Sequence, residues 1–134
     1  MAAFTLDIVT PERKIFSGPV ESLQAPGSQG SFGVLARHAP MIAALRVGPL
    51  RFVEEGSSEP RLLACSGGFV EVQGEQVTVL AEAAEFGDEI DRARAATARE
   101  RAQERLGRRE GIDSTRADVA LARALNRLRI AGSD

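Results

Sequence analysis

The chain has 134 residues, enough for one or two small domains, and its hydrophobic content of 43% is typical of a globular protein. Only 4% of the residues are aromatic, so a core must consist mainly of Val, Leu, Ile and Ala. The formal net charge of -2, with acids interspersed among the arginines, gives little support to nucleic-acid binding. No segment approaches the ~20 apolar residues of a membrane-spanning helix, and no signal-peptide pattern opens the chain. We therefore expect a soluble chain that reaches a membrane only through a partner.

The residue pattern changes near Phe86. Before it, short alternating runs of apolar and polar residues are punctuated by Gly and Pro, whereas after it the chain has no Pro and is rich in Ala and Arg. Residues 1–87 carry 6 basic and 10 acidic side chains, and residues 88–134 carry 11 basic and 9 acidic ones. These differences predict a β domain over residues 1–86 and a helical domain over residues 87–134.

The first region contains short runs with an apolar residue at every second position, which is the pattern of half-buried strands. Turn residues recur often enough to favour a β sandwich or flattened barrel, and the absence of βαβ spacing argues against a parallel sheet. The single cysteine, Cys65, excludes an internal disulfide and lies in an apolar run, so we expect it to be buried. The expected strands are 4–9, 20–25, 33–35, 42–47, 50–54, 61–65, 68–73 and 76–80.

The second region predicts a first helix over residues 89–106. Asp88 is its expected N-cap, and the acids that follow suit the positive end of the helix dipole. Apolar residues recur along this segment, and the stripe that they predict is Ile90, Ala95, Ala98, Ala102 and Leu106.

A second helix is expected after a turn bracketed by Gly107 and Gly111. It should begin with Asp113 or Ser114 as its cap and run to about Ile130. The short connection predicts an antiparallel hairpin, but alanine stripes bury little area, so the hairpin should depend on docking elsewhere or on a ligand. The expected stripe of the second helix is Ala117, Leu121, Ala124, Leu125 and Leu128.

Three further features imply little chemistry of their own. The Gly-rich loop 27–33 lacks the P-loop pattern and a following helix, so a β-turn is expected. His38 is the single histidine and has no partners for a metal site or a catalytic triad. It is either a loop residue hydrogen-bonded to its surroundings or a contact residue at an interface. Glu82 and Glu85 are close in sequence, but nothing implies a catalytic pocket around them.

The arginines are more informative. Each helix carries three at positions i, i+7 and i+11 on one face, namely Arg94, Arg101 and Arg105, then Arg116, Arg123 and Arg127. In an antiparallel hairpin Arg94 would converge with Arg123 and Arg127. Guanidinium groups bind phosphate and carboxylate bidentately, which favours a site for a polyphosphate or an acidic protein surface. The alternative is a solvated face paired with Glu100 and Glu104.

Several stretches of the chain resemble a known family. Residues 33–40, Gly-Val-Leu-Ala-Arg-His-Ala-Pro, resemble the pattern G-x-L-P-G-H-A-P, and residues 66–72 with 77–82 resemble S-G-G-F-x-E-V followed by V-T-V-L-A. Both patterns are typical of the epsilon subunit of F-type ATP synthases, called delta in mitochondria. The resemblance covers essentially the whole chain, including Ala-Leu-Asn-Arg-Leu at 124–128.

This resemblance implies a ten-stranded β sandwich followed by a two-helix hairpin. It implies a non-catalytic subunit of the central rotor, with no catalytic residue, no required cofactor and no metal. The implied partners are the gamma subunit, the ring of c subunits and, when the hairpin extends, the alpha/beta catalytic head, where the hairpin inhibits ATP hydrolysis. The implied location is the cytoplasmic face of the bacterial plasma membrane, as part of the complex.

Some bacterial members of this family bind ATP on the folded hairpin through the motif I/L-D-x-x-R-A. Residues 90–95, Ile-Asp-Arg-Ala-Arg-Ala, fit it fully. The resemblance therefore makes ATP the expected regulatory ligand, in agreement with the arginine convergence expected from spacing. The positions that match the family site are Glu85, Ile90, Asp91, Arg94, Ala95, Arg101, Arg123 and Arg127.

One departure from the family concerns the loop that would contact the ring or the gamma subunit. The usual Pro-Gly before His38 is Ala36-Arg37 here. Glycine permits a positive φ, which Ala and Arg resist, so a loop of different shape is expected and the contacts expected at Ser31 and His38 depend on it.

From the residues alone, two other classes stay open. One is a free-standing binder of nucleic acid or another polyanion through the arginine faces, which salt-dependent DNA binding would favour. The other is a small hydrolase, for which the sequence offers no nucleophile and base set.

Overall fold

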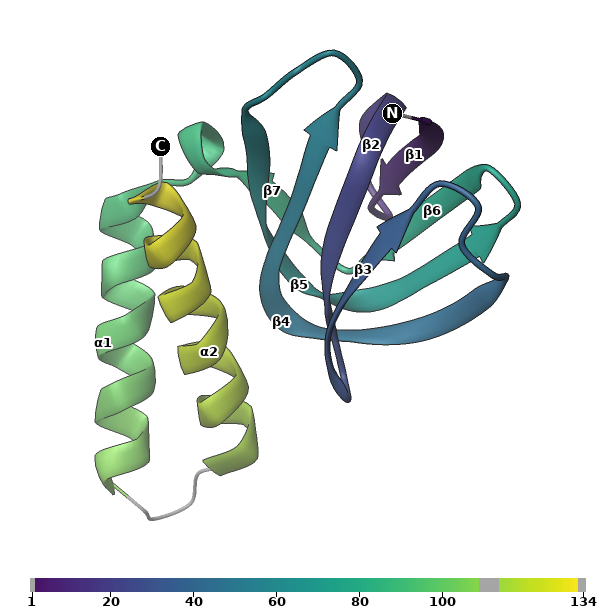
Figure 1. The fold of residues 1–134 in the computed structure, drawn as a ribbon. Coiled ribbons are helices and arrows are strands. Elements are labelled where there is room, and N and C mark those ends of the chain that lie inside the picture. Colours follow the sequence, from purple (N-terminus) through teal and green to yellow (C-terminus); the bar gives the residue numbers. More distant parts are fainter. Residues whose placement is uncertain (1, 109–113, 133–134) are drawn as a thin grey trace.

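The computed structural model describes residues 2–108 and 114–132, which form a β barrel and a helical hairpin beside it (Figure 1). The expected cap Asp113 and the turn residue Gly111 lie outside the described residues. The elements in chain order are β1 (Phe4–Val9), β2 (Lys14–Gly27), β3 (Gly30–Leu35), β4 (Met41–Glu54), β5 (Pro60–Gln73), β6 (Gln76–Ala81), β7 (Ala84–Phe86), the 3₁₀ helix η1 (Gly87–Glu89), α1 (Arg92–Arg108) and α2 (Ser114–Ala131).

Five strands close on themselves in the order β1-β6-β5-β4-β2 and back to β1, with β3 added beside β2 and β7 beside β5. The neighbours are antiparallel except β1 and β6, so the sheet is not a parallel one, as expected, although it contains one parallel pairing. That pairing joins the two ends of the sheet, so it depends on barrel closure rather than on any local sequence pattern. Residues 27–30 form the tight β2–β3 turn, as expected for the Gly-rich loop.

The described residues form seven strands, five of which close a barrel, in place of the expected ten-stranded sandwich. The difference arises because β2, β4 and β5 each run for 14 residues and bend in the middle. The segments 42–47 and 50–54, expected as two strands, are halves of β4, and 61–65 and 68–73 are halves of β5. Glycines that resemble turns in the sequence therefore act as bends.

Gly68 shows why one such bend requires glycine. Its φ is +131°, and a Cβ at this position would lie 2.0 Å from the backbone oxygen of Leu80 on the neighbouring β6. Any other residue would require β6 to move. Gly68 therefore allows β5 to bend within the sheet while it stays paired with β6.

The core follows from the period-two pattern of the strands. Cys65 is buried, as expected, and burial raises the pKa of its thiol to about 11. The largest inward side chains are aliphatic, with Phe52 among them, as the composition requires. The following have no exposed surface: Leu6, Ile8, Val20, Leu50, Phe52, Leu63, Val70 and Val79.

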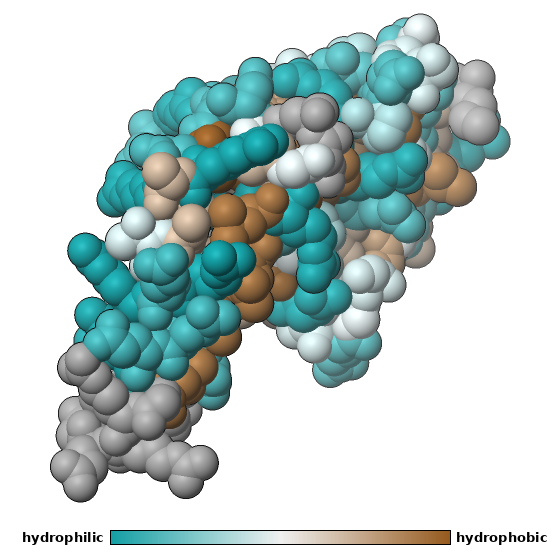
Figure 2. All heavy atoms as spheres, turned by 90° about the vertical axis from the view of Figure 1, so that its left-hand side faces the viewer, coloured by the Kyte–Doolittle hydropathy of each residue, from teal (hydrophilic) through white to brown (hydrophobic). Residues whose placement is uncertain are grey.

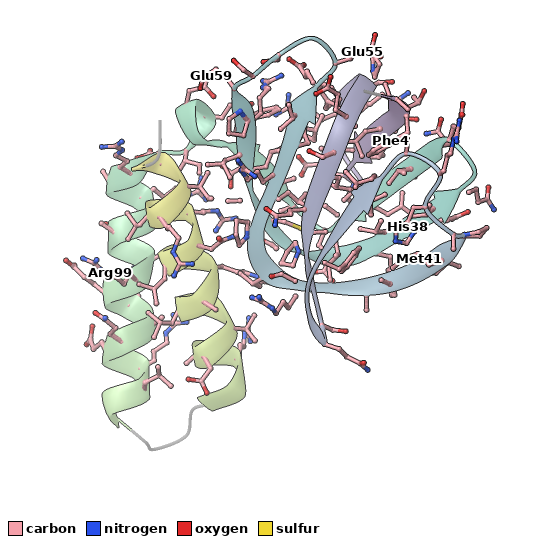
Figure 3. All side chains as sticks on the ribbon, viewed as in Figure 1. Phe4, His38, Met41, Glu55, Glu59 and Arg99 are labelled. Carbon is pink, nitrogen blue, oxygen red and sulfur yellow. The ribbon has the colours of Figure 1, made fainter. Side chains whose placement is uncertain are left out.

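The loop after β3 lies on the side of the barrel away from the hairpin, where His38 and Met41 are found (Figure 3). Arg37 has a φ of +66° and is the single non-glycine residue with positive φ in the described part of the chain. Arginine was expected to resist a positive φ, and Arg37 nevertheless adopts one. A non-glycine residue in the left-handed region is strained by about 1–2 kcal/mol.

The two helices lie antiparallel, and α2 packs between α1 and strands β4 and β5 (Figure 1). The face that the hairpin presents to solvent is mostly hydrophilic, with a hydrophobic strip running along it (Figure 2). The helix seam is built from small side chains, as expected. Leu125, however, is 42% exposed and does not belong to it. The buried alanines are Ala95, Ala102, Ala117, Ala124 and Ala131.

The first helix begins later than expected. Asp88 lies in η1, and Ile90 precedes α1 in an extended conformation. Asp91 is the residue that caps α1, because its Oδ1 accepts a hydrogen bond from the backbone N–H of Arg94 at 3.0 Å. The sequence offers acids at three neighbouring positions, and the helix starts at the last of them. No described helix is long and apolar enough to cross a membrane.

Candidate functional site

A cavity of about 750 Å³ opens between the interdomain linker and the two helices. Its walls come from β7, η1, the linker residues before α1, α1 as far as Arg101 and one residue of α2, so the folded hairpin brings all of these walls together. Its volume is in the range of pockets that hold small molecules. The lining residues are Glu85, Glu89, Ile90, Asp91, Arg94, Ala95, Thr97, Ala98, Arg101 and Arg127.

Three arginines supply the positive charge of this cavity. Arg94 and Arg101 lie two helical turns apart on α1, and Arg127 reaches the cavity from α2. Arg127 donates from Nε to Oε1 of Glu85 at 2.7 Å, whereas the side chains of Arg94 and Arg101 form no ion pair with any described residue. The cavity therefore offers two uncommitted guanidinium groups, which suit an anionic ligand.

The three carboxylates of the cavity are already engaged. Glu85 pairs with Arg127, and Asp91 caps α1. Glu89 accepts from Nη2 of Arg13 at 2.9 Å, and this hydrogen bond lowers the pKa of Glu89. Because each acid has its own partner, the acids leave Arg94 free to meet a ligand.

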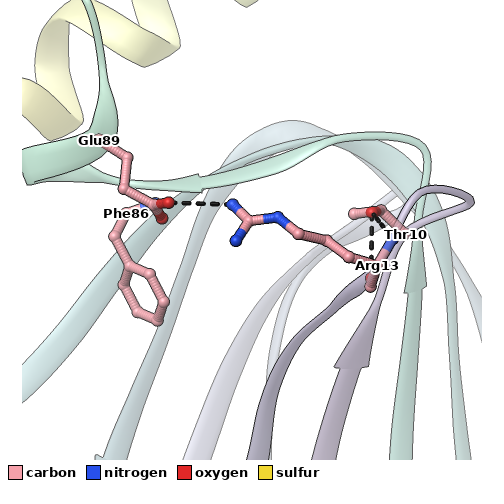
Figure 4. Close-up of polar contacts among 4 residues, drawn as sticks. All are labelled: Thr10, Arg13, Phe86 and Glu89. Atoms are coloured by element: carbon pink, nitrogen blue, oxygen red, sulfur yellow. Dashed lines mark hydrogen bonds and ion pairs between the residues drawn. The ribbon is translucent and has the colours of Figure 1, made fainter.

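Glu89 also fixes the linker to the barrel (Figure 4). It accepts from the backbone N–H of Phe86 at 3.2 Å, and Thr10 holds the turn from which Arg13 extends. The guanidinium carbon of Arg61 lies 4.0 Å from the centre of the Phe86 ring, which secures the end of β7. The chain thus keeps contacts with the barrel as far as Glu89, and the hairpin begins after this residue.

The apolar part of the cavity wall consists of Ile90 and Ala95, which are 8% and 4% exposed. Both belong to a small cluster that includes Ile130 of α2 and Ala64 of β5. This wall is continuous with the seam between the hairpin and the barrel. A flat, weakly polar ligand group could pack against it while an anionic group reaches the arginines.

Seven of the eight residues expected at an ATP site therefore line one cavity, and the eighth does not. Arg123 lies one turn before Arg127 on α2 and approaches Glu82, with Nη2 3.6 Å from Oε2. Its Nε is buried and has no hydrogen-bond partner among the described residues. The convergence expected of Arg94, Arg123 and Arg127 holds for Arg94 and Arg127 alone, because Arg123 faces the barrel.

Sequence reasoning did not assign three of the lining residues to the site. Thr97 and Ala98 lie three and four positions after Arg94, so the helical repeat that relates Arg94 to Arg101 could have found them. Glu89 had no such signal, since its place depends on the ion pair with Arg13, 76 positions earlier in the chain. Among the described residues, no cluster of His, Cys, Asp and Glu could hold a metal ion.

The residues expected at a second contact site lie far from this cavity. The hydroxyl of Ser31 accepts from Nη2 of Arg46 at 3.4 Å, and Nδ1 of His38 lies 2.7 Å from the carbonyl oxygen of Ala39. Nearby, the outer face of the sheet exposes large apolar side chains, which neighbouring strands bring together. Phe69 of β5 is paired with Leu80 of β6 and Ala44 of β4. The most exposed are Leu35, Ile42, Phe69 and Leu80, at 61%, 73%, 54% and 48%.

The described chain is thus a closed β barrel with a docked helical hairpin and a cavity lined by arginines where the linker meets the helices. Two family descriptions match it: "ATP synthase, Delta/Epsilon chain, beta-sandwich domain" over residues 3–87, and "ATP synthase, Delta/Epsilon chain, long alpha-helix domain" over residues 88–132.

Curated relatives match along nearly their whole length. The chain is 46% identical over 132 residues to the ATP synthase epsilon chain of Bacillus pumilus, covering 98% of this chain and 99% of that one. It is 47% identical over 135 residues to the epsilon chain of Symbiobacterium thermophilum, with coverages of 99% and 96%. A chain in the Euglena gracilis mitochondrial ATP synthase superposes with a TM-score of 0.84 at 26% identity, covering 98% of this chain and 82% of that one. The chain belongs to the epsilon subunit family of F-type ATP synthases.

Proposed function

We propose that the chain is a non-catalytic subunit of the central stalk of a bacterial F-type ATP synthase, where its barrel joins the gamma subunit to the c ring. The names of its relatives support membership of the complex, and the Euglena structure contains F1 together with a c ring. The assembly would lie at the cytoplasmic face of the plasma membrane. The exposed apolar face around Phe69 is the surface that the gamma subunit would cover, because apolar groups of this size gain most from being buried.

In this proposal the hairpin has a separate, regulatory role. ATP binds in the cavity and holds the hairpin docked on the barrel. Without ATP the hairpin extends and inhibits ATP hydrolysis. The observation that carries the ligand is the pair of uncommitted guanidinium groups of Arg94 and Arg101, with Arg127 on the neighbouring helix. They would hold the triphosphate. Ile90 and Ala95 would pack against the adenosine, and Asp91 would orient the start of α1 rather than touch phosphate.

Ligand binding would act on the hairpin through mass action. ATP would bind only the folded arrangement, since the cavity walls come from the linker and from both helices. A ligand that binds one state stabilises it by RT ln(1 + [L]/Kd), which is about 2.7 kcal/mol at a hundred times Kd. That energy is comparable with the strength of a few polar contacts, so it is enough to control a weakly docked hairpin.

Calorimetry of the full chain with ATP tests the ligand. Arg94→Ala should weaken binding by roughly 1.5–3 kcal/mol, the scale of one charged hydrogen-bonding partner. Arg99→Ala is the matched control, because Arg99 is on the same helix and does not line the cavity (Figure 3). Arg123→Ala should have a smaller effect than Arg94→Ala, since Arg123 faces Glu82. Absence of heat and of thermal stabilisation at millimolar ATP, or equal losses in Arg94→Ala and Arg99→Ala, would contradict an ATP site here.

A truncated chain tests the regulatory part. An enzyme assembled with residues 1–87 should keep coupling and should hydrolyse ATP faster at low ATP than the enzyme with the full chain. The physical reason is that the barrel and its apolar face remain while the hairpin is removed. Unchanged hydrolysis in the truncated complex would show that the hairpin does not inhibit this enzyme.

A further inference from the structure

The face of α2 that touches the barrel is polar for most of its length. Arg123 approaches Glu82 at 3.6 Å, and Arg127 pairs with Glu85 at 2.7 Å. Asn126 lies between these two ion pairs and is only 7% exposed. Both ion pairs are partly open to solvent, where such pairs contribute little. The buried contact among the three is therefore that of Asn126.

The side chain of Asn126 contacts the backbone of two strands at once. Its Nδ2 donates to the carbonyl oxygen of Gly48 on β4 at 3.0 Å and to that of Cys65 on β5 at 3.3 Å. Gly48 and Cys65 are partners in the β4–β5 pairing. Carbonyl oxygens only accept hydrogen bonds, so the amino group must face the barrel. These two bonds fix both the position and the rotation of α2 on the barrel.

The other half of the amide has no such partner. Oδ1 of Asn126 is buried without a hydrogen bond to any described residue. When the hairpin leaves the barrel, this oxygen and the two freed carbonyl groups can all bond to water. Docking thus forms two directed hydrogen bonds and leaves one buried acceptor without a partner. The contact therefore specifies one position of α2 on the barrel but contributes only a modest net free energy to docking.

We propose that Asn126 is a latch: its bonds to Gly48 and Cys65 hold the folded hairpin in one register on the barrel, and its unsatisfied oxygen keeps that docking easy to reverse. The latch also sets where the adjacent Arg127 enters the cavity. It does not depend on ATP, because all of its contacts lie within the chain.

Hydrogen exchange of the full chain without nucleotide tests the latch. Asn126→Ala and Asn126→Leu remove both donors and leave two carbonyl groups facing an apolar side chain. Ala and Leu are better helix formers than Asn, so a purely local role would make α2 exchange more slowly. The latch predicts the opposite, with exchange across α2 faster by roughly tenfold to thirtyfold, the scale of one to two buried hydrogen bonds.

Leu125→Ala is the matched control, because Leu125 is the neighbouring residue and is 42% exposed. It should leave the exchange of α2 within about twofold of the original chain, and barrel exchange should be unchanged in all three variants. Unchanged or slower exchange of α2 in either Asn126 variant would overturn the proposal.

A second measurement needs no substitution. Asn126 is the single asparagine in the sequence, so selective ¹⁵N labelling gives one unambiguous pair of side-chain amide signals. The latch predicts amide protons that exchange slowly and shifts away from those of a solvated asparagine. Solvent-like shifts with fast exchange would overturn the proposal even if the variants failed to fold. Because neither measurement contains ATP, a failed latch and a failed ATP site are separate results.

Discussion

The barrel and the hairpin are stabilised in different ways. The barrel buries large aliphatic side chains and Phe52, and its strands close on themselves through β1 and β2. The hairpin packs through alanines, and its contact with the barrel includes one buried amide, two partly exposed ion pairs and a small apolar cluster around Ile130. A fully buried Leu or Phe contributes several times what an alanine does. One chain thus combines a barrel with a large aliphatic core and a hairpin that is held by smaller contacts.

The largest expected effect concerns the barrel core. Phe52 has no exposed surface, and its ring centre is 4.5 Å from that of Phe16. Phe52→Ala should lower the free energy of unfolding by about 3–5 kcal/mol, measured by denaturant titration. Phe69→Ala, which shortens a phenylalanine that is 54% exposed, should lower it by less than about 1 kcal/mol. Similar losses in both variants would show that the barrel does not depend on its core in this way.

A second substitution separates the two regions. Ala124 is 1% exposed in the helix seam, and Ala124→Leu would push the helices apart at a cost of about 1–3 kcal/mol. We expect faster hydrogen exchange over residues 92–131 and unchanged exchange in the barrel. Ala122→Leu, at an exposed position of the same helix, is the control and should have no such effect. If Ala124→Leu accelerated exchange equally in the barrel, the two regions would form one cooperative unit.

The smallest effect is expected at the linker. Arg13 and Glu89 are 60% and 37% exposed, so Arg13→Ala should lower stability by less than about 1 kcal/mol at pH 7. The pKa of Glu89 lies below its ordinary value of 4.5 in the folded chain. The stabilisation is therefore fully present above pH 4.5 and is lost as the pH falls through the lower, folded value. The difference between the two chains should shrink in acid, and a difference that grew in acid would contradict the ion pair.

Local sequence pattern predicted most strands and both helices because alternation and helical repeats are local properties. It did not predict that Gly67 and Gly68 bend one long strand instead of ending it, since that depends on how closely β6 approaches. The parallel β1–β6 pairing likewise depends on closure of the barrel. The cap of α1 at Asp91 is a local contact, but acids at three neighbouring positions left the sequence with more than one candidate cap.

In the site, too, local pattern predicted some features, and contacts between distant parts of the chain decided the others. The family motif and the arginine spacing identified most of the cavity lining, because these residues share one helix face or follow each other directly. Spacing placed Arg123 with Arg127, but the rotation of α2 turns Arg123 toward Glu82. Asn126 bonds to the barrel on the same side of α2, and its partners lie 78 and 61 positions away in the chain, beyond the reach of any local pattern.

We propose that the hairpin is a separately docked unit whose docking is controlled by an anionic nucleotide. Hydrogen exchange of the full chain with and without ATP measures this control. At a hundred times Kd, we predict exchange of the hairpin amides slowed by up to roughly a hundredfold, with barrel exchange unchanged and the slowing largely lost in Arg94→Ala. Slowing spread equally over barrel and hairpin, or no slowing in the hairpin, would contradict the account.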